Sequence, residues 1–188
     1  MDAHPPSGEN GRVSELPSPQ SELLEALYRG DHDTVEATLA ERPDLTIFEA
    51  AAVGDSDRVR ELLSLQPVSA AAWSPDGFTA LHFAAFFGRE RVAATLLERG
   101  ADVSAVARNP LRVQPLHSAA AGGHTPVARL LLERGADPNA RQEGGFVPLH
   151  AAAQARNEEL YELLLASGAD QDVATDDGRT AADFRADS

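Results

Sequence analysis

The sequence contains no cysteine and no lysine, and only 5% of its residues are aromatic. Without cysteine, neither a disulfide framework nor a thiolate metal site is available. No apolar run approaches the length of a membrane-spanning helix, and the first residues lack the basic and apolar regions of a signal peptide. These absences predict a cytoplasmic protein. The use of arginine for all 16 basic residues, together with abundant alanine, favours a bacterial source with a GC-rich genome.

The chain is also poor in positive charge, with a formal net charge of −14. Nucleic-acid binding needs a basic stripe that neutralises phosphates, and anionic membrane surfaces attract basic segments. The sequence supplies no such cluster, so we expect neither nucleic acid nor a membrane as partner. A basic or neutral protein is compatible with this charge. The charge is better explained by the solubility that it gives to an alanine-rich chain.

One segment of the sequence occurs three times. Its copies are residues 77–102 (GFTALHFAAFFGRERVAATLLERGAD), 112–137 (RVQPLHSAAAGGHTPVARLLLERGAD) and 145–170 (GFVPLHAAAQARNEELYELLLASGAD). The Leu-His pair within them begins at residues 81, 116 and 149, which places the copies 35 and 33 residues apart. A fixed period of this size indicates supersecondary units that stack because none can bury its apolar face alone.

Each copy reads as two short helices joined by a turn. Pro115 and Pro148 stand where a first helix begins, a position that needs no backbone N–H, and Thr79 stands at the preceding capping position. A pair of alanines follows in each copy and allows another helix to approach closely. The second helix carries valine and leucine at the spacing of one helical face, and a glycine ends it. The pattern predicts an all-α solenoid of helix-turn-helix units with extended, hairpin-like connectors.

These motifs closely resemble the ankyrin repeat, whose signature runs T-P-L-H-x-A-A-x-x-G-H and then V-x-x-L-L-L-x-x-G-A-D. The departures are local: Ala80 replaces the proline in the first copy, Gln114 and Val147 replace the threonine in the next two, and Arg156-Asn157 stands where Gly-His is expected in the third. The resemblance implies a protein–protein interaction module or scaffold that docks a partner on its concave face.

The repeat pattern extends in both directions with more divergence. IFEAAAVGDSDRVRELL and SELLEALYRGDHDTVEATL each align with the repeat, and DDGRTAADF restarts it near the end. We therefore expect a disordered tail over residues 1–17 and a repeat domain over 18–188. Its predicted units are residues 18–45 (an N-terminal cap), 46–73, 74–108, 109–141, 142–174 and a C-terminal half-repeat lid, 175–188.

His82, His117 and His150 recur at the repeat period. We call these three residues the ladder histidines, and two hypotheses fit them. They could form a metal or acid–base site, which would make the protein an enzyme or a metal-binding protein, or they could have a structural role. The resemblance implies that each imidazole bridges backbone and capping groups of adjacent repeats. Periodicity strongly favours the structural role, because catalysis rarely needs one residue per repeat. We find no nucleophile motif and no phosphate-binding glycine loop, and we expect no catalytic activity, no metal and no cofactor.

The residues that vary between copies are the candidates for partner binding. The resemblance places two kinds of position on the concave face, at the connector tips and on the exposed side of each first helix. The residues there and beside them that we assign to partner binding are Trp73, Phe78, Phe83, Phe86, Phe87, Val113, Phe146, Gln154 and Arg179. Six of these are aromatic, and all but Phe146 gather around one short helix. Exposed aromatic clusters are typical binding hot spots. The alternative is that they pack internally.

If Phe86 and Phe87 are exposed, replacing both by alanine should leave folding nearly intact and weaken partner binding. The connector at residues 107–110 is two residues longer than its equivalent, and Arg108, Arg112 and Arg141 could form a basic lip there. The protein is expected to be a monomer, with structural self-assembly as the alternative.

Overall fold

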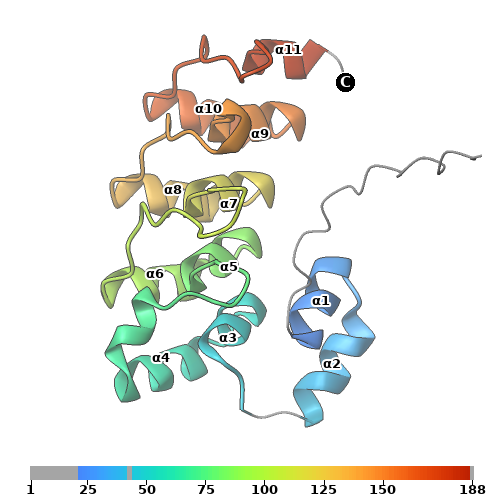
Figure 1. Ribbon diagram of the computed structural model, residues 1–188, viewed down its shortest axis with the longest axis vertical. Helices are drawn as coiled ribbons and strands as arrows, with labels where there is room; N and C mark the ends of the chain where they lie inside the picture. The colour runs from blue at the N-terminus through green and yellow to red at the C-terminus, as the bar shows by residue number, and fades with distance from the viewer. Residues whose placement is uncertain (1–20, 42–43, 187–188) are drawn as a thin grey trace, which may run out of the picture.

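The computed structural model describes residues 21–41 and 44–186 of the 188-residue chain. These residues form a curved stack of helical pairs, shown with its long axis vertical in Figure 1. The tail expected over residues 1–17 lies outside the described residues, and the limits of the repeat units stay a prediction.

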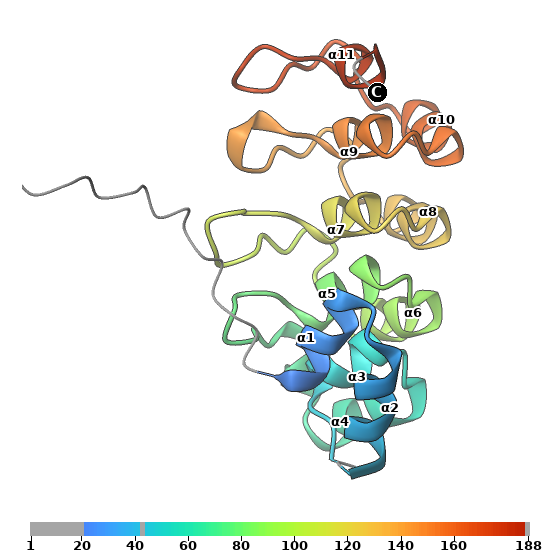
Figure 2. The same ribbon diagram turned by 90° about the vertical axis from the view of Figure 1, so that its right-hand side faces the viewer.

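Helices arranged in two layers make up the stack. The first helix of each unit belongs to an inner layer, the second to an outer layer, and each helix packs on its equivalents above and below (Figures 1 and 2). The inner helices are α3 (Ile47–Val53), α5 (Ala80–Phe86), α7 (Pro115–Ala121), α9 (Pro148–Gln154) and α11 (Ala181–Ala186). The outer helices are α4 (Ser56–Leu65), α6 (Glu90–Glu98), α8 (Thr125–Glu133) and α10 (Glu158–Ala166).

The connectors between units are extended loops that lie to one side of the inner helices (Figure 2). Two of them contain a short 3₁₀ turn, η1 (Pro67–Ala71) and η2 (Glu143–Gly145). Within the described residues β-pairing is limited to the isolated bridges of Trp73 with Thr79 and of Ala174 with Thr180. The fold is therefore all-α, as the sequence predicts. None of the helices in this part of the chain is long and apolar enough to cross a bilayer.

The helix ends follow the chemistry of the repeats. Pro115 and Pro148 begin α7 and α9, and the residues after the outer helices, at Gly100, Gly135 and Gly168, have φ of 86°, 87° and 92°. This left-handed conformation favours glycine. Arg156 takes it as well, with φ of 51°, at the turn where the other strong repeats have glycine.

The core runs the length of the stack between the two layers. The alanine pairs of α5, α7 and α9 are buried, and so are the central leucines Leu96, Leu131 and Leu164 of the outer helices. The small alanine side chains let the inner helices approach one another closely, and leucines from both layers fill the space between the layers. Nearest-neighbour burial of this kind holds a repeat array together.

The first helical pair, α1 (Glu22–Arg29) and α2 (His32–Glu41), does not continue this stack. Both views place it beside the inner helices, in front of α3 in Figure 2, whereas the sequence pattern suggests a cap in line with the array. Its α1 buries Leu23 and Ala26 against α3, but α2 buries only Thr38. Val35 and Leu39 of α2 are only partly buried against the core, so the pair contacts the stack chiefly through the packing of α1 on α3.

Gly122 lies where two inner helices, α5 and α7, approach each other closely. Its φ of −76° suits any residue, but a Cβ there would lie 2.2 Å from the Phe86 carbonyl oxygen of α5. We predict that Gly122→Ala lowers the free energy of unfolding by about 1–3 kcal/mol, the usual cost of overpacking. Urea denaturation measures this change.

Ala155 provides the matched control because it occupies the same place after α9 with φ of −76°. Ala155→Gly should cost no more than about 1 kcal/mol, the conformational cost of glycine. A Gly122→Ala protein as stable as the wild type would show that helix spacing at α5 and α7 is not limited by this contact.

Candidate functional site

The hollow side of the curved stack is formed by the inner helices, their connector tips and α1. We call this surface the concave face (Figure 1). Equivalent positions recur along it in successive repeats. Phe78, Val113, Phe146 and Arg179 occupy one such position at the tips, and Phe86, Ala121 and Gln154 occupy another at the ends of α5, α7 and α9.

Most of the aromatic residues assigned to partner binding do lie together, but not all are accessible. Phe83 is only 1% exposed and belongs to the core, where its ring packs 6.2 Å from Phe48 and 5.8 Å from Phe78. Phe78 and Phe87 are half-buried and pack against the core, so removing Phe87 would also cost stability. Phe86 is half-buried at the surface. A partner can therefore contact Phe78 and Phe86, with Phe83 behind them.

Tyr28 of α1 completes this aromatic group, although it is not among the residues assigned to partner binding from the sequence. Its ring lies 5.4 Å from that of Phe86 and 5.1 Å from that of Phe87. Burial, with a smaller effect of the Asp76 carboxylate, raises the pKa of Tyr28 to about 12. The hydroxyl therefore stays protonated, as a hydrogen-bond donor beside a carboxylate. Only the offset position of α1 brings Tyr28 here.

The other assigned residues lie elsewhere. Trp73 lies beneath the guanidinium of Arg108, which is 4.4 Å from its ring centroid. Phe146 packs on His150 and Phe184, and the Arg179 guanidinium lies 3.9 Å from the centroid of Phe184. The contacts of Phe146 and Arg179 therefore lie at the C-terminal end of the array, away from Phe86. Gln154 is exposed on α9.

A largely apolar pocket of about 590 Å³ opens on the concave face between α1, α5 and α7. Its walls are the aromatic residues Tyr28, Phe78 and Phe86, with Val113 across from them. This volume lies within the range of about 300–1,000 Å³ that is usual for ligand pockets. Val113, Phe78, Phe83 and Phe86 thus share one site, whereas Trp73, Phe87, Phe146, Gln154 and Arg179 do not line it.

The longer connector at residues 107–113 forms the outer rim of the pocket. The Arg108 amide donates to the Gly77 carbonyl (2.8 Å), and the Asn109 side-chain amide donates to the Asp76 carbonyl (3.0 Å). On its other side, the Leu111 carbonyl accepts a hydrogen bond from the Glu143 amide (3.2 Å). The insertion is therefore held between the two neighbouring tips, and Pro110 and Leu111 project at the rim.

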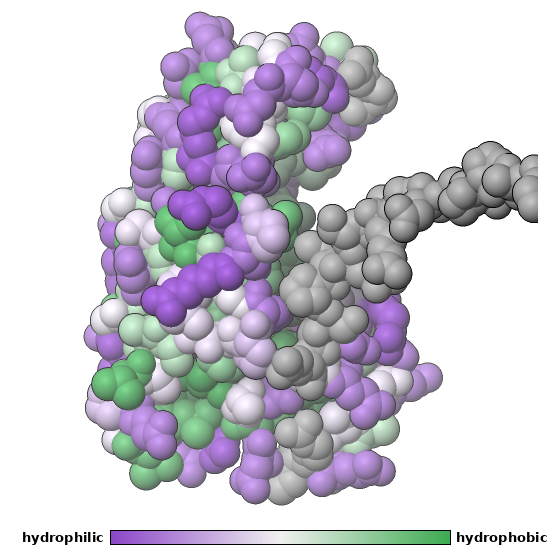
Figure 3. All heavy atoms as spheres, viewed as in Figure 1, coloured by the Kyte–Doolittle hydropathy of each residue, from purple (hydrophilic) through white to green (hydrophobic). Residues whose placement is uncertain are grey.

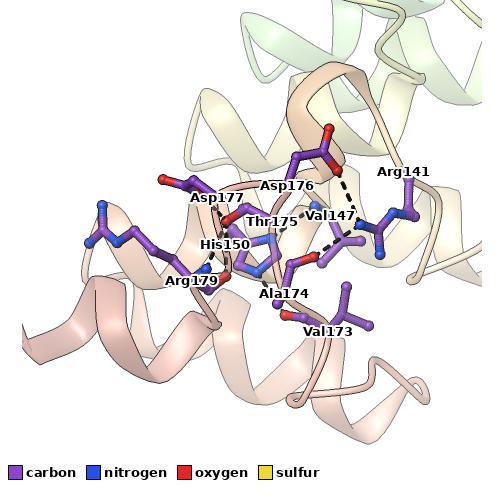
Figure 4. Close-up of polar contacts among 9 residues, drawn as sticks. All are labelled: Arg141, Val147, His150, Val173, Ala174, Thr175, Asp176, Asp177 and Arg179. Atoms are coloured by element: carbon purple, nitrogen blue, oxygen red, sulfur yellow. Dashed lines mark hydrogen bonds and ion pairs between the residues drawn. The ribbon is translucent and has the colours of Figure 1, made fainter.

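The expected basic lip does not form as one cluster. Arg108 stacks on Trp73 in the preceding connector, whereas Arg141 points toward the following one. There the Arg141 guanidinium donates to the Ala174 carbonyl (3.0 Å) and lies 3.7 Å from the Asp176 carboxylate (Figure 4). Each arginine joins successive connectors.

The sequence model of one family, ankyrin repeats in three copies, matches residues 22–107 and again 105–177. The chain belongs to the ankyrin-repeat family. Proteins built from ankyrin repeats are generally protein–protein interaction modules and typically non-enzymatic scaffolds. The match begins at residue 22 and so includes α1 and α2.

The ladder histidines of this ankyrin array bond to the backbone. In His82, Nδ1 accepts a hydrogen bond from the Thr79 amide (3.2 Å), so Nε2 carries the proton and donates to the Val113 carbonyl of the next connector (3.1 Å). His150 is bonded in the same way to the Val147 amide and the Val173 carbonyl, each at 3.0 Å (Figure 4). Each of these imidazoles thus bridges its own helix start and the connector that follows.

His117 makes only half of this bridge. Its Nδ1 accepts from the Gln114 amide (3.2 Å), but Nε2 is buried without a hydrogen-bond partner. Burial lowers the pKa of both His82 and His117 to about 4, and it also lowers the pKa of His150. Among the described residues, no three His, Cys, Asp or Glu side chains are grouped to hold a metal ion. The neutral, backbone-bonded rings have the geometry of structural bridges.

These pKa values predict a stability change with pH. The pKa of His82 is about 4 in the folded chain, whereas an unperturbed histidine has a pKa of 6.5. Between these two pH values the unfolded chain therefore binds more protons than the folded chain. The contribution of the neutral imidazole to the free energy of unfolding is then fully present above pH 6.5. It falls as the pH drops toward 4, by about 1.4 kcal/mol per pH unit for each such histidine.

His82→Gln should reduce this dependence. Glutamine at this position can still cap the helix start, as in the capping box, but it does not titrate. We predict a lower free energy of unfolding at pH 7, by about 1–3 kcal/mol, and a smaller further loss between pH 7 and 5 than in the wild type. His32→Gln, on the exposed surface, should change neither value. If His82→Gln loses as much free energy of unfolding between pH 7 and 5 as the wild type, His82 is not the source of the pH dependence.

Proposed function

We propose that this ankyrin array binds a partner protein through its concave face and has no catalytic role of its own. The observation that carries the proposal is the apolar pocket between α1, α5 and α7. Half-buried aromatic rings beside an open cavity bury a large area on binding at low entropic cost, which is typical of interaction hot spots. Nothing in the repeat architecture requires this cavity.

The charge of the array agrees with a protein partner. A net charge of −14 disfavours nucleic acid and anionic membranes, whose phosphates need basic groups. The arginines that come nearest to a basic cluster are held by contacts within the array, Arg108 on Trp73 and Arg141 on Ala174. We accordingly place the protein in the cytoplasm as a monomer that uses neither metal nor cofactor.

A second apolar surface favours a rival function, self-association. At the outer edge of the lower end, over α4 and η1, Leu65 is 71% exposed and Val68 is 81% exposed (Figure 3). Leu65 belongs to the outer helix α4 and Val68 to the turn η1, and neither lines the pocket. A partner or a second copy that docks there would be independent of the pocket, so the two surfaces can be tested against each other.

Affinity capture from a lysate of the source organism tests the proposal. We predict that Phe86→Ala loses a protein that the wild type captures, because Phe86 forms a wall of the pocket. Leu65→Ala with Val68→Ala, on the outer layer, should capture that protein as well as the wild type. Circular dichroism of each variant checks that the helices are retained.

The opposite pattern would contradict the proposal. If Phe86→Ala keeps the partner and the outer-layer variant loses it, docking occurs over α4 and η1. Sedimentation of the wild type across a range of concentrations then decides whether the partner there is a second copy of the chain.

A further inference from the structure

We propose that the pocket receives one large apolar side chain from a peptide segment of the partner, and that a lysine or arginine next to it pairs with Asp76 at the rim. This inference rests on the proposed function and goes beyond it, because it states the chemistry of the partner. It concerns only the pocket between α1, α5 and α7, not the concave face above it.

The apolar half of the proposal follows from a step in side-chain size between two successive repeats. Phe78, Phe83 and Phe86 of the α5 repeat have Val113, Ser118 and Ala121 at the equivalent places of the α7 repeat. Three large rings are thus followed by three small side chains, and all six line the pocket. The room left by the smaller set faces the rings of the larger set, which makes a cavity for a flat or branched apolar group.

Two further departures from the repeat pattern close this space. The insertion carrying Asn109 and Leu111 forms one rim, and α1 forms the opposite wall with Glu25 and Tyr28. In a regular array α1 would lie below α3, and this wall would be missing. The inserted residues, the change in side-chain size and the offset helix α1 come from different parts of the chain and meet at this pocket. The pocket is therefore specific to this sequence.

The cationic half of the proposal follows from the charges at the rim. Glu25, Arg29 and Asp76 are the charged residues that line the pocket. Glu25 and Arg29 lie on the same helix with 3.7 Å between Oε2 and Nη1, so these two charges offset each other. Asp76 accepts a hydrogen bond from the Ser74 hydroxyl and is in none of the ion pairs of the described residues. A cation from the partner would give it a charge-assisted hydrogen bond.

The charge of the whole array favours the same partner. A net charge of −14 attracts a basic segment at long range and repels an acidic one. The aromatic rings of Tyr28, Phe78 and Phe86 accept both the apolar side chain and the methylene stem of a neighbouring arginine or lysine. An acidic segment would instead be repelled by Asp76 and by the net negative charge of the array.

A selection from random peptides tests the proposal. Phage displaying a library of random 16-residue peptides are selected on the full chain, and enriched peptides are then measured by fluorescence anisotropy. We expect a consensus with one large apolar residue beside an arginine or lysine. Asp76→Asn keeps the acceptor for Ser74 but removes the charge, and it should weaken binding by about threefold to tenfold.

Two phenylalanine substitutions locate the bound peptide. Ala121→Phe gives α7 the residue that α5 carries at the same place, so the helix should still fold while the ring fills the pocket. Gln154→Phe makes the same change on α9, outside the pocket. Binding should fall by about tenfold or more in Ala121→Phe, the size of a hot-spot loss, and stay within about twofold in Gln154→Phe. Thermal unfolding confirms that both are folded.

Each other outcome overturns the inference. Peptides that bind Ala121→Phe as tightly as the wild type, or a consensus without a basic residue, remove the proposed chemistry. Peptides lost only in Gln154→Phe move docking to α9 and leave the concave face as the binding surface. If no peptide is enriched while 8-anilinonaphthalene-1-sulfonate binds the wild type and not Ala121→Phe, the pocket takes a small apolar molecule. The capture experiment then decides the proposed function separately.

Discussion

The close approach of the inner helices is the constraint on which this array depends. Alanine pairs face each other from α5 to α9, and the Phe86 carbonyl lies against Gly122, where even a Cβ would collide. This spacing fixes the distance between repeats. It thereby sets whether an imidazole can reach the next connector, as His82 and His150 do. In His117, the same residue type at the same place, Nε2 has no hydrogen-bond partner, so this bridge is incomplete in the α7 repeat.

The scaffold and the candidate site use different residues. Capping prolines, alanine pairs and terminal glycines recur and hold the helices in register, whereas the pocket is built from positions at which neighbouring repeats differ. Phe86 and Ala121 occupy the same place in successive helices, and the difference in their size is room for a ligand. An array of this kind can change its partner without changing its core, because Phe86 and Ala121 are not among the buried alanines and leucines that form it.

The sequence predicts the array well because its information is local and repeated. A proline or glycine specifies a helix end wherever it stands, and three copies of one pattern confirm each other. The site is less predictable. Leu23 and Ala26 define an apolar face of α1, but not which neighbour it meets, so Tyr28 could not be placed beside Phe86. Phe83 and Phe86 lie one turn apart, and only the packed structure shows that the first is core and the second is surface. Trp73 is covered by Arg108, which belongs to a loop 35 residues later.

The offset of α1 and α2 has a consequence for the dynamics of the pocket. In a repeat array the ends open by local unfolding more readily than the middle, because they have a neighbour on one side only. The pocket combines both kinds of region: α5 and α7 lie in the interior of the stack, but another wall belongs to the terminal pair, which contacts the stack chiefly through α1. The amides of α1 and α2 should therefore exchange with solvent before those of α5 and α7. A ligand that contacts Tyr28 would slow that exchange, and part of its binding energy would be spent on ordering the wall it touches.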